Sequence, residues 1–139
     1  MGTRRKSRIK EPGQKKSGNR IPEPIRQETT HHDYVTVSFT HLCERNLQLE
    51  ELGKRDLKQL SNFLRRVSSM TWQQVRNSDG IKMKKIPRYS ISYPVPQTVS
   101  EDEDIFEMRV SQEHRLWGFP NNGTFYIIWF DPTHAVCPA

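Results

Sequence analysis

The chain has 139 residues, enough for one domain, and only 33% of them are hydrophobic, so part of it should lie outside any core. Its longest apolar run, residues 125–130, falls far short of the ~20 residues of a membrane helix, and no apolar segment follows the basic N-terminus as in a secretory signal. We therefore exclude an integral membrane protein and a secreted one. Cys43 and Cys137 are the only cysteines, too few for a disulfide scaffold, so we expect the protein to reside in the reducing cytoplasm.

Residues 1–30 carry the whole net charge of the chain. They hold nine basic and three acidic residues, a balance of +6, whereas the remaining residues hold 13 of each. The segment has no aromatic residue and is rich in Gly, Pro, Ser, Lys and Arg, so it cannot bury enough surface to offset chain entropy. We predict a disordered basic arm that attracts phosphate backbones by counterion release. The alternative is a solvated tail that keeps the protein soluble.

Residues 31–139 are predicted to form one domain that begins with a strand and two helices. Residues 34–39 alternate apolar and polar side chains and are rich in β-formers, which favours a strand. Residues 47–52 are expected to form a short helical turn that ends near Gly53. Apolar residues then recur at helical spacing, which predicts an amphipathic helix of about 14 residues from Lys54. The apolar positions of this helix are Leu57, Leu60, Phe63, Leu64 and Val67.

A second, short helix should follow at once. Thr71 and Gln74 have the spacing of a capping box, and the turn signal at 77–80 limits the length of the helix. Residues 81–86 alternate apolar and basic side chains and are predicted to form a strand. Three prolines make residues 87–100 an irregular or edge segment.

The last third of the chain has the pattern of a β-meander. Residues 105–110 and 115–119 read as strands joined by the short connection 112–114. Asn-Gly at 122–123 is a strong hairpin signal. Residues 124–130 are apolar on both faces, which indicates a covered strand. The predicted fold class is α+β, with a small antiparallel sheet packed against N-terminal helices.

The segment Met-Arg-Val-Ser-Gln-Glu-His-Arg-Leu-Trp-Gly-Phe, residues 108–119, resembles the central hairpin of the RelE/ParE-type toxin family. There, a strand ending in Arg, a polar turn and a strand starting with Arg precede a third, apolar strand, here 124–130. The resemblance covers residues 35–134, and its motif-like part is 105–134. It implies a RelE-like fold and cleavage of messenger RNA, often on the ribosome, or poisoning of DNA gyrase in a ParE-like member. It also implies a cognate antitoxin protein as partner.

The sequence departs from the family pattern in three places. Family members tend to end in a strand or helix with basic or tyrosine residues, which 135–139 does not offer. The arm at 1–30 is not part of the compact family domain, and the acidic, proline-rich insert at 94–104 is unusual. These departures indicate that the fold could be retained while the site has moved.

Four residues are candidates for RNA cleavage without a metal or other cofactor. Such cleavage needs acid and base groups together with cations that stabilise the phosphorane charge. Arg109 and Arg115 flank one turn and could hold a phosphate between them. His134, at the exit of the last strand, is the first choice for proton transfer, and His114 is the second. The alternatives are surface ion pairs for both arginines, a solvated His114, and a His134 that only hydrogen-bonds Asp131.

Five further basic residues are predicted to bind the nucleic-acid backbone: Lys82, Lys84, Lys85, Arg65 and Arg66. Alternation would place Lys82 and Lys84 on one face of a strand. The alternative is an ordinary solvated face. The acidic loop 101–107 could shield this basic surface in the free protein.

Other interpretations remain open at this point. His134 and Cys137 have metal-ligand spacing, but nothing in the sequence brings two further ligands to them, so no metal site is predicted. A Cys43–Cys137 disulfide is possible and not required. The chain could also be a non-catalytic nucleic-acid-binding domain, which would not need His134. Alternatively, it could be a gyrase-inhibitor-like module that binds a protein through its amphipathic helix or its acidic loop.

Overall fold

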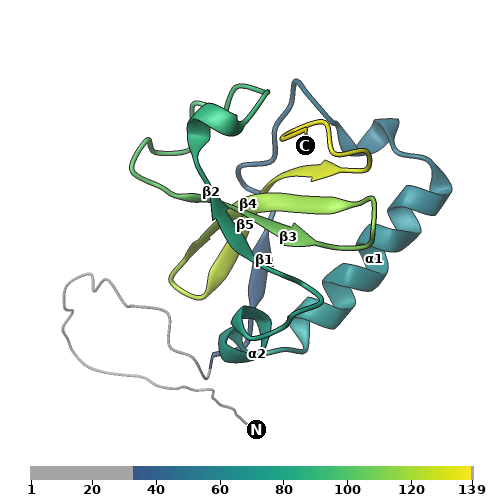
Figure 1. Ribbon diagram of the computed structural model, residues 1–139, viewed down its shortest axis with the longest axis vertical. Coiled ribbons are helices and arrows are strands. Elements are labelled where there is room, and N and C mark those ends of the chain that lie inside the picture. Colours follow the sequence, from purple (N-terminus) through teal and green to yellow (C-terminus); the bar gives the residue numbers. More distant parts are fainter. Residues whose placement is uncertain (1–32, 139) are drawn as a thin grey trace, which may run out of the picture.

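The computed structural model describes residues 33–138, and the predicted basic arm lies outside these residues. Figure 1 shows a small sheet with a long helix, α1, running alongside it. Within the described part of the chain, no helix is both long and apolar enough to cross a membrane. The elements in chain order are β1 (Thr36–Ser38), the 3₁₀ turn η3 (Leu49–Glu51), α1 (Lys54–Ser68), α2 (Trp72–Arg76), β2 (Lys84–Ile86), the 3₁₀ turn η4 (Arg88–Ser90), β3 (Ile105–Arg109), β4 (Arg115–Asn121) and β5 (Thr124–Asp131).

The five strands form one sheet in the order β1-β5-β4-β3-β2. β1 pairs with β5 in parallel, and the other neighbours are antiparallel. The predicted hairpin at 122–123 is confirmed, because Asn122 and Gly123 both adopt positive φ angles, 53° and 84°, as a two-residue type I′ turn requires. The α+β class with a mainly antiparallel sheet is therefore correct.

Both predicted helices are present and cover one face of the sheet. In α1, Leu60, Phe63 and Val67 are buried and share a core with Leu116 and Phe125 of the sheet. This burial of one apolar stripe, rather than an N-terminal side-chain cap, holds α1 in place, because its N-cap is Gly53.

The start of α2 confirms the capping-box prediction. The backbone N–H of Gln74 donates to the Thr71 hydroxyl, and the Thr71 N–H donates to the Gln74 side chain. The two bonds satisfy donors that the first turn of a helix cannot pair internally.

The other face of the sheet is covered by loops. Trp117, Ile128 and Trp129 pack there against Val99 and Val136. The backbone N–H of Ser92 donates to the carbonyl of Val136 at 2.7 Å, which ties the proline-rich segment to the C-terminal segment. The sequence prediction of helices on one face is confirmed, but it did not include this loop-built second core.

A close approach of two strands makes Gly118 necessary. A Cβ atom at this position would lie 2.0 Å from the carbonyl oxygen of Tyr126 and 2.9 Å from the Phe125 ring. The register between β4 and β5 shifts at the same place, between Trp117 and Gly118. Because of this shift, Ile128 and Trp129 both contribute to the loop-covered core, although a regular strand would send them to opposite faces.

The strand predicted over 81–86 is shorter than expected. β2 begins only at Lys84, because Lys82 has a φ of 48° in the left-handed region and cannot continue a strand. The prediction that Lys82 and Lys84 share one strand face is therefore wrong.

Candidate active site

The predicted arginine pair lies directly across two neighbouring strands. Arg109 at the end of β3 is the register partner of Arg115 at the start of β4. Met108 and Leu116 enter the helix-side core, so their strand neighbours Arg109 and Arg115 lie on the loop-covered face. Arg109 is exposed and forms no ion pair with any of residues 33–138. Like charges placed opposite each other destabilise a sheet unless another group compensates them.

Arg115 is buried and anchors the β3–β4 turn. Its side chain is only about 8% exposed, and Nη1 donates to the carbonyls of Ser111 at 2.7 Å, Gln112 at 3.2 Å and His114 at 3.0 Å. Burial lowers the pKa of Arg115, and the charge of Arg109 lowers it further, whereas Glu107 and Asp131 oppose the shift. The guanidinium is therefore fixed in position by the turn that it closes.

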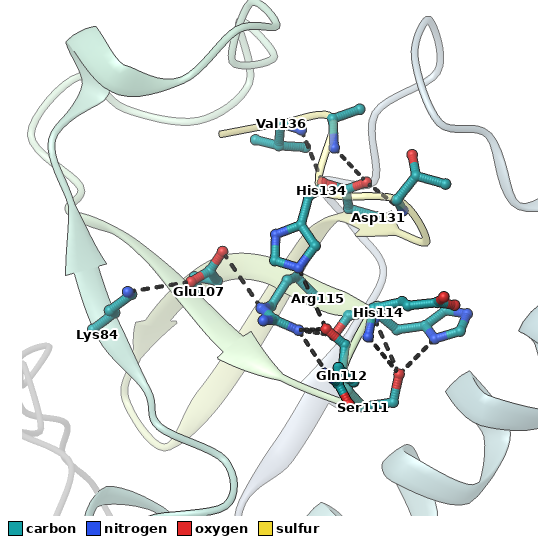
Figure 2. A network of polar contacts seen from close by, with 12 residues as sticks. Lys84, Glu107, Ser111, Gln112, His114, Arg115, Asp131, His134 and Val136 are labelled. Carbon is teal, nitrogen blue, oxygen red and sulfur yellow. Dashed lines mark hydrogen bonds and ion pairs between the residues drawn. The ribbon is translucent and has the colours of Figure 1, made fainter. Parts of the chain in front are cut away.

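A carboxylate that the sequence prediction missed completes the cluster. Glu107 of β3 is 9% exposed, and its carboxylate oxygens lie 3.9 Å from Lys84 Nζ and 3.9 Å from Arg115 Nε. Figure 2 shows it between these two cations. The alternation of the predicted strand 105–110 could have identified Glu107, because Glu107 and Arg109 are two residues apart on its polar face. Only the pairing of β2 with β3 shows that Lys84 is its partner.

His134 reaches the same turn from the C-terminal side. It is half-buried and has a φ of 63°, an uncommon conformation for a residue other than Gly. Its Nε2 lies 3.4 Å from the carbonyl of Gln112, which also accepts from Arg115. Figure 2 shows the ring pointing toward the turn that holds Arg115.

Asp131 holds the loop that carries His134. Its carboxylate accepts the backbone N–H groups of Thr133, Ala135 and Val136 at 3.1, 3.0 and 2.8 Å. These three bonds, rather than a bond to the imidazole, are how the buried Asp131 is satisfied. They fix the backbone on both sides of His134 and leave the ring facing the cluster.

His114 is buried on the other face of the sheet. It is 4% exposed, its Nδ1 is 2.7 Å from the Ser111 hydroxyl, and its Nε2 is 2.8 Å from an Asp56 carboxylate oxygen. Its ring stacks on Phe130 with the centroids 5.4 Å apart. The alternative of a solvated histidine at the turn tip is therefore wrong, and His114, the second choice for proton transfer, does not join the cluster.

The predicted backbone-binding residues divide between the two faces. Lys84 belongs to the cluster through Glu107, and Lys85 on the same strand pairs with Asp104 at 3.8 Å. Lys82 is exposed in the turn before β2. Arg65 and Arg66 lie in the last turn of α1, on the helix-covered side, and do not join the cluster.

The two cysteines and one hollow were other candidates for a site, and none of them contains a residue of this cluster. Cys43 and Cys137 are both free thiols. Over residues 33–138, no three His, Cys, Asp or Glu side chains gather in an arrangement that could hold a metal ion. A hollow of about 380 Å³ lies between residues 40–46 and 94–98 and includes none of the predicted site residues.

Comparisons with known proteins give one structural similarity. No family model matches the chain, and the search of curated proteins finds no match. Among solved structures, the chain is similar to one in the crystal structure of the archaeal RelE-RelB complex from Pyrococcus horikoshii OT3. The two are 13% identical, the TM-score is 0.40, and the match covers 74% of this chain and 96% of that chain. A similarity of this degree assigns no activity to the cluster.

Proposed function

We propose that the protein is an endoribonuclease that cleaves RNA without a metal ion, at the cluster formed by Lys84, Glu107, Arg109, Arg115 and His134. The observation that carries the proposal is the Arg109–Arg115 pair. The two residues are register partners on neighbouring strands and carry like charges, and one of them, Arg109, is exposed. A phosphate bound there would relieve the repulsion between them, and guanidinium groups match its geometry.

The cluster has the groups that this chemistry requires. The 2′-hydroxyl of a ribose attacks the adjacent phosphorus and loses its proton to a base. The bond from phosphorus to the 5′-oxygen breaks, and that oxygen takes up a proton from an acid. The products are a 2′,3′-cyclic phosphate and a free 5′-hydroxyl, so the step consumes no water. Acid–base groups contribute about 10²–10⁴-fold to such a rate.

Four residues of the cluster have roles that follow from their surroundings. Arg109 is exposed and binds the phosphate. Glu107 is held beside two cations and accepts the proton of the 2′-hydroxyl. His134 faces the same turn and delivers a proton to the leaving oxygen. Arg115 donates to three carbonyls, so it orients the turn. Its positive charge stabilises the developing negative charge from a fixed position, and Arg115 does not move to bind the phosphate.

The sequence supports a substrate, a partner and a cellular location for this activity. The resemblance of residues 108–119 to a toxin hairpin supports messenger RNA, free or on the ribosome, as the substrate. It also supports a cognate antitoxin as partner and a cytoplasmic protein. The nine basic residues of 1–30 would add backbone affinity without sequence preference.

The test is incubation of the full chain with end-labelled single-stranded RNA in EDTA. The wild type should give fragments with 2′,3′-cyclic phosphate ends, and His134→Ala and Glu107→Gln should lose cleavage while still binding. Arg109→Ala should lose affinity as well, whereas Arg45→Ala, at an exposed arginine of the 40–46 loop, is the matched control. Folding of each variant is checked by circular dichroism.

Three outcomes would contradict the proposal. Cleavage that disappears in EDTA would show a metal-dependent reaction. Binding of free and ribosome-bound RNA without cleavage would identify a nucleic-acid-binding domain. Absence of both binding and cleavage would favour a protein-binding module of the gyrase-inhibitor kind.

A further inference from the structure

The outward face of α1 carries an unusually uniform charge. Five exposed cations line it, and we name them the α1 basic stripe: Lys54, Arg55, Lys58, Arg65 and Arg66. At 100° and 1.5 Å per residue, they fall within a sector of about 120° and span about 18 Å along the axis. The buried side chains of α1 occupy the opposite side of the helix.

The charges of the stripe are uncompensated within the described chain. None of its five members forms an ion pair with another of residues 33–138. The one polar contact of Arg65 is with a neutral group, since Nη1 donates to the Asn62 side-chain oxygen at 3.0 Å. Asp56, the acidic residue of α1, is turned toward the sheet and bonded to His114. Five like charges on one face repel each other and attract a polyanion.

The stripe and the cluster lie on different sides of the sheet. α1 packs against the face into which Met108 and Leu116 point, whereas Arg109 and Arg115 lie on the other face. The few nucleotides around a scissile phosphate cannot contact both surfaces. Any ligand on the stripe would therefore be a separate part of a large molecule, or a separate molecule, from the one at the cluster.

The stripe lacks the side chains that bind single strands. Proteins that bind single-stranded nucleic acid combine a basic groove with aromatic side chains on which bases stack. The large exposed apolar side chains of residues 33–138 are Tyr34, Phe39, Leu57 and Tyr89, and the one on α1 is the aliphatic Leu57. A straight row of cations on a rigid helix suits instead the dense and regularly spaced phosphates of a duplex.

We infer that the α1 basic stripe binds the phosphate backbone of a double-helical nucleic-acid segment. The inference rests on the proposed function in one respect, namely that the duplex is a folded part of the RNA that is cleaved or of the particle that holds it. Contacts with phosphates carry no direct sequence information, so binding should depend on shape and salt and not on sequence. The cluster then acts on a single-stranded region near a structured one.

The test measures affinity for an RNA hairpin with a long stem, in the His134→Ala background so that no cleavage intervenes. The variants are Lys58→Gln and Lys54→Gln/Lys58→Gln, and Arg45→Gln is the control with one charge removed elsewhere. Each lost phosphate contact should reduce the salt slope of log K by about 0.9, which is about 8-fold in affinity at 0.1 M salt. Arg45→Gln should leave both quantities near those of the parent. A DNA hairpin of the same sequence shows whether the duplex must be RNA.

The outcome can separate this inference from the proposed function. Cleavage of a short single-stranded RNA by chains with an intact His134 should be the same with and without Lys54→Gln/Lys58→Gln. Hairpin affinity and salt slope unchanged by the double variant would overturn the inference and leave the cleavage proposal intact. Tighter binding of poly-glutamate than of the hairpin, lost in the double variant, would also overturn it and identify an acidic protein as the occupant.

Discussion

Replacing His114 by Ala should destabilise the fold by about 3 kcal/mol, because His114 is buried between the β3–β4 turn and α1. The substitution removes the contact of Nε2 with Asp56 at 2.8 Å and the contact of Nδ1 with Ser111 at 2.7 Å. Each is worth about 1 kcal/mol, and the stack on Phe130 adds about 0.5–1.5 kcal/mol. The Asp56 side chain is 31% exposed, so water can take over its lost bond. The total is a large share of the roughly 5–15 kcal/mol that stabilises a domain.

Urea unfolding followed by tryptophan fluorescence measures this change, since Trp117 and Trp129 are both buried. Gln112→Ala, at an exposed position of the same turn, is the control and should shift the midpoint little. A double-mutant cycle with Asp56→Ala should give a coupling energy of about 1 kcal/mol. A loss of less than about 0.5 kcal/mol in His114→Ala, or the absence of coupling, would refute the assignment of His114 to the fold.

Three further predictions follow from individual contacts. Gly118→Ala should unfold the domain or lower its stability by more than the roughly 1–3 kcal/mol of ordinary overpacking, because the atom clashing at 2.0 Å is a backbone oxygen; a near-normal urea midpoint would contradict this. Asp131→Asn should release the C-terminal segment, because an amide offers one carbonyl oxygen to three backbone donors. Backbone hydrogen exchange at 133–136 should then become faster, and unchanged exchange would contradict this. Replacing Glu101 by Gln and both Asp102 and Asp104 by Asn should free Lys85 from its ion pair and tighten RNA binding at low salt. Fluorescence anisotropy measures the affinity, and an equal affinity would refute the idea that the acidic loop shields the basic surface.

Much of the fold was predictable because its local signals agree with its packing. The apolar spacing of α1, the capping box of α2 and the Asn-Gly turn each act within a few residues. The covered strand at 124–130 was also recognised from its apolar faces and corresponds to β5. Its parallel neighbour β1 could not be placed, because the pairing joins residues almost 90 positions apart, such as Thr36 and Thr124.

The candidate site was harder to predict because its key contacts are long-range. The Arg109–Arg115 pair followed from a hairpin and was anticipated. Glu107 was missed because its partner Lys84 comes from another strand, and the burial of His114 was missed because Asp56 lies 58 residues away. The sequence showed His114 beside a polar turn, where an exposed side chain is the ordinary expectation, and it did not show that α1 would cover it.

One turn links the two halves of the molecule. On one face of the sheet, the carbonyls of Ser111, Gln112 and His114 hold the guanidinium of Arg115. On the other face, the hydroxyl of Ser111 and the imidazole of His114 bond each other, and that imidazole bonds Asp56 of α1. The position of Arg115 therefore depends on how α1 docks, and α1 also carries the basic stripe. A rigid connection of this kind would keep a duplex bound on α1 at a fixed distance and orientation from the phosphate held at Arg109, which is what cleavage beside a structured region requires.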